Sequence, residues 1–403
     1  MLMPSALGRG LENKMLKTKG RFGLEQIEEY QVEATPDADI VVNANETNWP
    51  LSKNLVNKIK ERTTSFAFNR YPPMHAESIC QILGDGMRVD ANKIIIGNGS
   101  SELLEKACYA FGGQGKKIAF PYPSFSMYET YAQLADSIPM PYPLTKEGYV
   151  DAASVIAFCQ QHRPQLLIIC NPNNPTGNYN SLEVMEQILQ NVECPVIMDE
   201  AYMEFAQVED ITGKLSTLSL LDSYDNFLCF RTFSKAYGLA AMRVGYGTGS
   251  ETLLKIMQKV LLPYHVNNFS LMVAELAYAE QELLRSRVRL ACRERDKMAK
   301  ILLSLGFKVF PSATNFLLFL PIGSIAFKLA RYGIKLGYKL EGSNESMAGA
   351  IVFSQLLGEK ILVRNFSAHP ALPGAIRLTI GTEEENVRIA AALQEICQKA
   401  QEE

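Results

Sequence analysis

The residues best suited to chemistry in this sequence lie between positions 199 and 243. Asp199 and Tyr202 follow an apolar run at 195–198, which predicts a buried strand. A carboxylate at the end of a buried strand is costly unless it meets a cation. Because ligands of open α/β sheets bind beyond the carboxyl ends of the strands, both side chains are candidates for a ligand site.

A second polar group follows the next apolar run, at 227–230. Thr232, Ser234 and Lys235 come directly after it, and Arg243 lies further along. Each residue alone has an ordinary explanation, such as a solvated lysine. Together with Asp199 they suit pyridoxal phosphate, which needs a lysine amine, an acid beside its ring nitrogen and donors for its phosphate.

Three further turns carry groups that suit the same cofactor. The first, 97–101, precedes a helix, so its free backbone N–H groups predict an anion site or an ordinary strand–turn–helix connection. Residues 121–128 form an aromatic cluster, which suits core packing or stacking on a flat ring. The segment 171–177 brings three asparagine amides to a turn, where two prolines and a glycine exclude helix and strand.

Two arginines near the C-terminus follow or interrupt apolar runs. Arg377 lies within 376–380 and needs an anion, either in a salt bridge or in a substrate carboxylate. For Arg364, after 361–363, a structural ion pair is the more common role. The segment between the two arginines contains two prolines and a glycine, which suits a connection that brings the chain back beside Arg364. Both guanidinium groups could then face one pocket.

A sheet must position these groups. Apolar strands near residues 94, 118, 167, 196 and 228 alternate with helical stretches, which predicts a mainly parallel sheet covered by helices. A long helical stretch at about 268–304 predicts the link to a second domain. Strands are expected there at 315–320, 360–363 and 376–381, before a final helix capped by Thr382.

Composition limits the possible functions. The chain has 403 residues and a net charge of −3, which argues against a nucleic-acid partner. No apolar run approaches the roughly 18 residues of a membrane span. The eight scattered cysteines, none in a C-x-x-C pair, predict buried free thiols in a reducing cytoplasm. The four histidines are far apart and predict no metal site.

The motifs resemble those of the class I/II pyridoxal-phosphate aminotransferases over roughly residues 40–395. They are Asn174-Pro-Thr-Gly, Asp199-Glu-Ala-Tyr202, Ser234-Lys235 with Arg243, and Arg377-Leu-Thr-Ile-Gly. Within the family, the chain is most similar to the histidinol-phosphate aminotransferases. That similarity rests on Arg70-Tyr71-Pro, Gly97-Asn-Gly-Ser-Ser-Glu-Leu, Pro172-Asn-Asn-Pro-Thr-Gly and Ile361-Leu-Val-Arg364.

The resemblance implies an α/β fold with two domains. A large domain with a mainly parallel sheet of the seven-stranded type, covered by helices, spans 51–280. A smaller α+β domain combines N- and C-terminal segments: residues 1–50 form an arm and part of it, and residues 281–403 form the rest. Two segments depart from the subgroup: 19–23 lacks an expected tyrosine, and 331–359 is longer than usual, with a loop at 341–346.

The resemblance also implies roles for the cofactor site. Lys235 bonds the cofactor and moves the proton, Asp199 pairs with the ring nitrogen, and Phe125 stacks on the ring. Tyr202 and Asn174 bond the ring hydroxyl. The phosphate is held by Ser100, Ser101, Thr232, Ser234 and Arg243, and by Tyr71 of a neighbouring subunit.

For the substrate, the resemblance implies that Arg377 binds the carboxylate or its equivalent and that Arg364 binds a phosphate. Asn174 also lies at the substrate. The expected reaction converts histidinol phosphate and 2-oxoglutarate to imidazole acetol phosphate and glutamate, in a cytoplasmic homodimer with shared active sites and no metal. An aromatic amino acid aminotransferase and a threonine-phosphate-type decarboxylase are the alternatives. Intact Lys235 and Asp199 argue against a non-catalytic binding protein.

Overall fold

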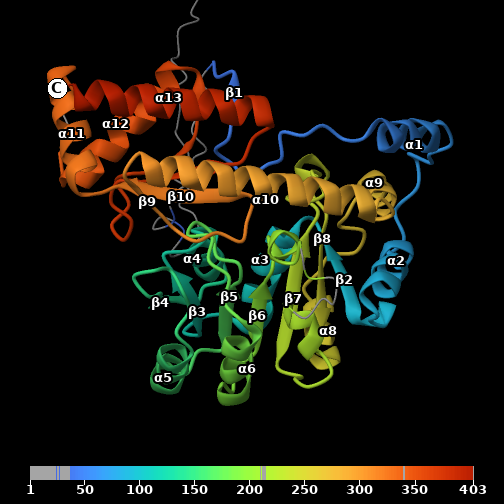
Figure 1. Ribbon diagram of the computed structural model, residues 1–403. Helices are drawn as coiled ribbons and strands as arrows, with labels where there is room; N and C mark the ends of the chain where they lie inside the picture. The colour runs from blue at the N-terminus through green and yellow to red at the C-terminus, as the bar shows by residue number, and fades with distance from the viewer. Residues whose placement is uncertain are drawn as a thin grey trace, which may run out of the picture.

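The larger sheet of the protein has seven strands (Figure 1). The computed structural model describes Leu24, Ile27 and residues 37–208, 210, 215–338 and 341–402. The strands are β2 (Ile94–Gly97), β3 (Lys117–Tyr122), β4 (Ile138–Pro143), β5 (Leu166–Cys170), β6 (Val196–Asp199), β7 (Phe227–Thr232) and β8 (Gly245–Gly249). Their order is β2-β8-β7-β6-β5-β3-β4, and only β8 runs antiparallel to its neighbours. The predicted mainly parallel sheet is confirmed.

Strands β4 and β8 were absent from the sequence prediction, each for a physical reason. β4 contains three prolines and lies at the sheet edge, where a missing N–H is tolerated. β8 is rich in glycine because its neighbours leave no room for side chains: a Cβ on Gly247 would lie 2.7 Å from the ring of Phe230. Neither composition is typical of a strand.

Helices cover both faces of this sheet. Alternate residues of its central strands face opposite sides: Ile168 and Ile197 pack with one helix layer, Ile169 and Met198 with the other. The first layer contains α3 (Ser100–Phe111), α4 (Met127–Leu134) and α8 (Glu251–Gln258), and the second contains α5 (Ala152–His162) and α6 (Leu182–Asn191).

A smaller antiparallel sheet lies beside the large one (Figure 1). Its order is β12 (Arg364–Phe366), β13 (Ala375–Thr379), β10 (Phe316–Pro321) and β9 (Phe307–Val309). It packs with α11 (Gly323–Lys335), α12 (Asn344–Gly358) and α13 (Glu383–Gln401). The N-terminal strand β1 (Ile40–Val41) pairs with β11 (Ile361–Leu362) in this part, so both ends of the chain build it, as expected. The domain boundaries at 50 and 280 stay a prediction.

The predicted helical stretch at 268–304 is confirmed, although it does not form one continuous helix. The segment forms α9 (Asn268–Tyr278) and α10 (Gln281–Ser304), with a break at Glu280. The Glu280 carboxylate accepts hydrogen bonds from Ser52 Oγ at 2.8 Å and Asn54 Nδ2 at 2.7 Å, at the start of α1 (Lys53–Thr64). A contact with a distant segment therefore fixes the break, and local sequence does not encode it.

The remaining helices and turns complete the fold. They are α2 (Glu77–Met87), α7 (Met203–Ala206) and 3-10 turns at Ala91–Lys93, Thr217–Leu220 and Ala240–Met242. Thr382 caps α13 in a capping box with Glu385, as predicted for that helix start. The expected loop at 341–346 is shorter than predicted, because α12 begins at Asn344 with a side-chain cap from Ser343. Residues 19–23 lie outside the described part of the chain.

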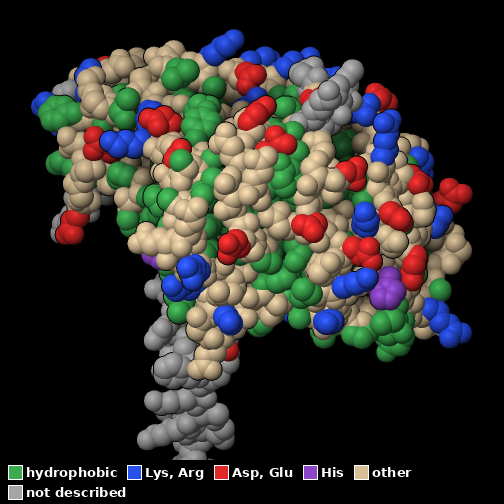
Figure 2. Space-filling view, turned by 90° about the horizontal axis from the view of Figure 1, so that it is seen from below, with side chains coloured by type: hydrophobic (Ala, Val, Ile, Leu, Met, Phe, Trp, Pro, Cys, Tyr) green, Lys and Arg blue, Asp and Glu red, His purple; other side chains and the backbone are tan. Residues whose placement is uncertain are grey.

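The distribution of charged residues and cysteines matches what the composition predicts. Lys and Arg side chains are interspersed with Asp and Glu on the face shown in Figure 2. All eight cysteines are unpaired and buried, as predicted. Within the described ranges, no helix is both long and apolar enough to cross a membrane. The same residues contain no cluster of three or more potential metal ligands.

Candidate active site

A cavity of about 510 Å³ lies at the carboxyl ends of β5, β6 and β7, and is called the central cavity below. It lies there because the parallel strands end in register, with Cys170 beside Asp199. It brings together every predicted site residue except Tyr71. These residues are Ser100, Ser101, Phe125, Asn174, Asp199, Tyr202, Thr232, Ser234, Lys235, Arg243, Arg364 and Arg377.

Asp199 is a buried carboxylate that ends β6. It accepts hydrogen bonds from Tyr128 Oη at 2.6 Å and from the backbone N–H of Ala201 at 3.2 Å. None of the described residues forms an ion pair with it, and burial raises the pKa of its carboxyl to about 6. The protein thus holds a costly anion in the cavity wall, where a cationic ligand group would stabilise it.

Lys235 supplies the only lysine side chain in the described wall of this cavity. Its Nζ donates to the carbonyl oxygen of Ala44 at 3.0 Å. Burial, followed by the positive charges of Arg377 and Arg243, lowers the pKa of the amine to about 8. A lowered pKa makes an unprotonated, nucleophilic amine available near neutral pH.

The predicted anion site combines the start of α3 with the turn after β7. Gly99 precedes the helix with φ of 82°, and a Cβ there would lie 2.6 Å from Arg243 Nη2. Arg243 Nη1 donates to Ser234 Oγ at 3.3 Å, and Thr232 Oγ1 donates to the same oxygen at 3.0 Å. Backbone N–H groups, hydroxyls and a guanidinium therefore converge where a phosphate fits.

Tyr202 and Asn174 both line the cavity, Tyr202 after β6 and Asn174 after β5. The Tyr202 hydroxyl accepts a hydrogen bond from Asn45 Nδ2 at 2.9 Å, and burial raises the pKa of this phenol. Asn174 Oδ1 accepts from Arg377 Nη1 at 2.5 Å. These bonds orient a phenol and an amide toward the same space.

The two C-terminal arginines lie directly opposite each other on neighbouring antiparallel strands, Arg364 on β12 and Arg377 on β13. Arg377 Nη2 also donates to the carbonyl oxygen of Asn43 at 2.7 Å. Arg364 is half-buried, lines the cavity, and makes no ion pair or side-chain hydrogen bond with a described residue. The expected return of the chain is confirmed, and among the described residues Arg364 has no structural ion pair.

Sequence reasoning missed several residues of the cavity. Tyr128 belongs to the aromatic cluster at 121–128, but nothing in the sequence indicates that its hydroxyl reaches Asp199. Asn43 and Asn45 sit in an ordinary-looking loop, yet they bond Arg377 and Tyr202. His369 is an isolated histidine between the two arginines, and burial lowers the pKa of its ring.

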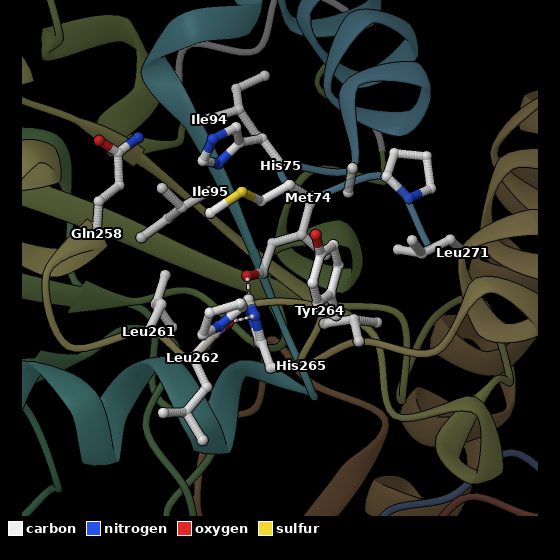
Figure 3. A pocket seen from close by; sticks show the side chains of 15 residues that line it. Met74, His75, Ile94, Ile95, Gln258, Leu261, Leu262, Tyr264, His265 and Leu271 are labelled. Carbon is white, nitrogen blue, oxygen red and sulfur yellow. Dashed lines mark hydrogen bonds between the residues drawn. The ribbon is translucent and has the colours of Figure 1, made fainter. Parts of the chain in front are cut away.

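Tyr71 does not line the central cavity of its own chain. Its ring is 81% exposed and stacks on Tyr264 with centroids 4.9 Å apart. Tyr264 borders a second, small cavity of about 100 Å³ beside Met74 and His265 (Figure 3). A role for Tyr71 at an active site would therefore require another subunit.

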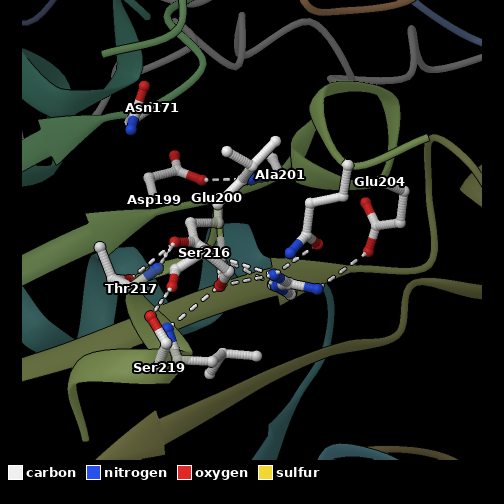
Figure 4. Close-up of polar contacts among 12 residues, drawn as sticks. Asn171, Asp199, Glu200, Ala201, Glu204, Ser216, Thr217 and Ser219 are labelled. Atoms are coloured by element: carbon white, nitrogen blue, oxygen red, sulfur yellow. Dashed lines mark hydrogen bonds and ion pairs between the residues drawn. The ribbon is translucent and has the colours of Figure 1, made fainter. Parts of the chain in front are cut away.

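A buried polar network supports the cavity from behind (Figure 4). Strand alternation sends Glu200 away from Asp199, to the opposite face. Its carboxylate accepts from Arg231 Nη2 at 2.9 Å, Ser216 Oγ at 2.6 Å and the backbone N–H of Thr217 at 2.7 Å. Because Arg231 lies on β7, this network ties that strand, which leads to Lys235, to the end of β6, which carries Asp199.

Comparison with known proteins identifies the family. The sequence profile described as "Aminotransferase class I and II" matches residues 39–393. The chain belongs to this family. This aminotransferase is 33% identical over 383 residues to a histidinol-phosphate aminotransferase of Thermoanaerobacter pseudethanolicus, covering 95% of this chain and 99% of the relative. It is 34% identical to that of Thermobifida fusca, covering 88% and 89%.

Solved structures share the fold of this aminotransferase. A histidinol-phosphate aminotransferase from Sinorhizobium meliloti, in complex with pyridoxal-5'-phosphate, matches with a TM-score of 0.78 at 21% identity, covering 90% of this chain and 92% of that one. An L-threonine-O-3-phosphate decarboxylase from Porphyromonas gingivalis matches with a TM-score of 0.71 at 21% identity, covering 89% and 99%. At these identities the similarity establishes the fold.

The cavity of this aminotransferase fits pyridoxal phosphate. Asp199 is a buried carboxylate that pairs with no cation of the described residues, which suits a protonated ring nitrogen. Lys235 has a lowered pKa, which suits a covalent bond to an aldehyde. The absence of a Cβ at Gly99 leaves space for the Arg243 guanidinium, which suits a phosphate.

Proposed function

We propose that this protein is a histidinol-phosphate aminotransferase that uses pyridoxal phosphate and passes the amino group of histidinol phosphate to 2-oxoglutarate. The arrangement of Arg364 opposite Arg377, in the cavity that holds Lys235 and Asp199, is the observation that carries the proposal. The names of the relatives reported above support the same substrate.

Pyridoxal phosphate, when bound, supplies an aldehyde for amines and a ring that accepts electrons. Asp199 would accept the ring N–H and balance its charge. Lys235 Nζ would take the proton that leaves the substrate carbon and later return it, because its pKa of about 8 makes both protonation states accessible near neutral pH. Tyr202 and Asn174 would bind the ring oxygen, and Phe125 would pack on the ring.

The residues at the start of α3 and after β7 would hold the cofactor phosphate. Ser100 and Ser101 contribute backbone N–H groups and hydroxyls at a helix start, where the helix dipole favours an anion. Thr232, Ser234 and Arg243 contribute the remaining donors.

Both half-reactions present an anionic end to Arg364. Histidinol phosphate offers a phosphate, and 2-oxoglutarate offers a second carboxylate. A guanidinium with no partner among the described residues can bind either one in turn, because its planar donors match both oxyanions. Arg377 would then orient the end of the substrate that lies nearer the lysine.

A substrate panel on purified protein tests the proposal. We expect glutamate to form from 2-oxoglutarate with histidinol phosphate as the best donor. Phenylalanine as the better donor would favour an aromatic aminotransferase. Carbon dioxide release from threonine phosphate, without glutamate, would favour the decarboxylase, whose solved example shares this fold.

Arg364→Ala gives a residue-level test of the substrate. Removing a desolvated partner of a phosphate should raise KM for histidinol phosphate by the equivalent of about 2–4 kcal/mol. Phenylalanine has no second anion, so its KM should change much less. Arg331→Ala, on α11 outside the cavity, is the control. Equal losses on both donors would assign Arg364 a structural role.

We further propose a homodimer in which Tyr71 completes the neighbour's cofactor site. Large apolar side chains are exposed on and beside its loop, which is typical of an interface. They are Phe68, Tyr71, Met74, Leu262 and Tyr264. The eight free, buried thiols support a cytoplasmic setting.

A further inference from the structure

His369 lies where the two sheets meet at the central cavity. It belongs to the loop between β12 and β13, which separates Arg364 from Arg377. Its ring stacks on Tyr122, at the end of β3 in the large sheet, with centroids 5.6 Å apart and planes 29° apart. It also meets the edge of the Phe366 ring at 6.0 Å. The ring therefore contacts one aromatic residue from each of the two sheets.

The hydrogen bonds of the loop determine which ring nitrogen faces a ligand. His369 Nδ1 accepts from the backbone N–H of Ala371 at 3.2 Å. The backbone of His369 is fixed in turn, because its N–H donates to Phe366 O at 2.8 Å and its carbonyl accepts from Leu372 N at 3.0 Å. In the neutral ring the proton must then sit on Nε2. Nε2 makes no hydrogen bond with a described residue and is available to a ligand.

The cavity thus contains a guanidinium and a neutral N–H donor from one hairpin. A carboxylate has two oxygens, and one guanidinium can bind both. A phosphate ester has three terminal oxygens, so a guanidinium leaves at least one without a donor. An additional N–H in the cavity that Arg364 lines would serve a phosphate and add little for a carboxylate.

We propose that His369 is a specificity-determining residue that donates its Nε2–H to the phosphate of the substrate. This inference rests on the proposed function, because it assigns the phosphate end of that substrate to Arg364 and His369 together. It explains how one pocket favours a phosphate ester while still admitting the dicarboxylate of the second half-reaction.

The test compares two probes that lack an amino group and cannot react. Calorimetry measures the binding of glycerol 3-phosphate and of glutarate to the holoenzyme, whose own phosphate site is filled. His369→Phe keeps the stack on Tyr122 and removes the N–H donor. We expect this variant to bind glycerol 3-phosphate about tenfold more weakly than the wild type, as for the loss of one hydrogen bond to a charged group. Its affinity for glutarate should fall less than about twofold.

Two more variants separate recognition from structure. His369→Gln can place an amide N–H near the position of Nε2 and should recover part of the lost affinity for glycerol 3-phosphate. His162→Phe makes the same exchange on α5, far from the cavity, and should bind both probes like the wild type. The inference would be overturned if His369→Phe weakened the binding of both probes equally, or if it bound glycerol 3-phosphate as tightly as the wild type. A wild type that does not bind glycerol 3-phosphate would overturn it as well.

The turnover of histidinol phosphate by the wild type is measured separately. If that substrate is not converted but the probes behave as expected, the proposed function fails and phosphate recognition by His369 stands. If it is converted and His369→Phe retains the wild-type KM and affinity, the proposed function stands and the role of His369 falls.

Discussion

At the scale of single residues, Asp199 is a buried carboxylate that forms no ion pair with a described residue. A buried carboxylate without a cation lowers the stability of the protein that carries it. Its pKa of about 6 lies above the ordinary value of 3.8, so the folded cofactor-free protein binds more protons than the unfolded chain between these values. The free energy of unfolding therefore falls as pH rises from about 4 to about 6, and the loss persists at neutral pH.

Asp199→Asn should consequently stabilise the cofactor-free protein. We expect its free energy of unfolding at pH 7.5 to exceed that of the wild type by up to about 3 kcal/mol, and the difference to shrink toward pH 4. Urea unfolding at several pH values measures this, with Asp225→Asn on an exposed turn as the control. The same variant should lose nearly all transaminase activity. A cofactor-free variant less stable than the wild type at pH 7.5 would show that Asp199 supports the fold.

Most of the residues that the sequence predicts for the site line the cavity, whereas the residues that contact and orient them could not be predicted. Asp199 ends an apolar strand and Lys235 closely follows another, and that local pattern is visible along the chain. Asn45 and His369 have no such pattern, because their partners lie on distant segments. Tyr128 was visible as an aromatic residue, but its bond to Asp199 depends on how α4 packs on the sheet.

At the scale of elements, uniform apolar runs made β5, β6 and β7 predictable. β8 could not be predicted because its glycines lie against neighbouring atoms, such as the Phe230 ring beside Gly247, and glycine is not typical of strands. The break between α9 and α10 depends on contacts with the start of α1. The turn before α3 is predictable only in part. Its glycines are visible in the sequence, but the contact with Arg243 that requires a glycine at position 99 depends on the fold.

Gly99→Ala tests that turn. The new Cβ would meet Arg243, and the backbone at φ of 82° strains any residue with a side chain. We expect a loss of about 1–3 kcal/mol in the free energy of unfolding together with weaker binding of pyridoxal phosphate. Fluorescence titration of the cofactor and urea unfolding measure the two effects.

Gly115→Ala is the matched control, because its φ is 73° and its Cβ would meet nothing within 4 Å. It should lose stability through the same backbone strain but bind the cofactor like the wild type. If both variants bind the cofactor equally well, Gly99 serves the turn alone and not the phosphate site.

At the scale of the whole molecule, a single chain leaves Tyr71 outside the cavity it is expected to serve. Mixing Lys235→Ala with Tyr71→Ala subunits tests the shared site. Each hybrid dimer would contain one doubly defective site and one intact site. Random exchange should therefore restore up to about a quarter of wild-type activity, as expected for a two-fold symmetric dimer.

The measurement is the activity after subunit exchange, with sedimentation to establish the dimer. Each variant incubated alone is the control. A mixture no more active than the average of its parents, in a sample that has exchanged subunits, would rule out a shared site. A fully active monomer would rule out the dimer itself.

The bond from Arg377 to Asn43 joins residues 334 positions apart. A ribosome adds about 5–20 residues per second, so roughly 20–70 s separate the synthesis of these two partners. The large sheet is complete in the nascent chain once Gly249 has emerged, long before either arginine of the small sheet exists. During translation, Lys235, Asp199 and the turn before α3 can therefore assemble first. The segment at 43–45 can form its contacts with β13 only after that strand has been synthesised. The strands that carry Arg364 and Arg377, the arginines proposed to bind the substrate, are thus synthesised long after the strands of the large sheet.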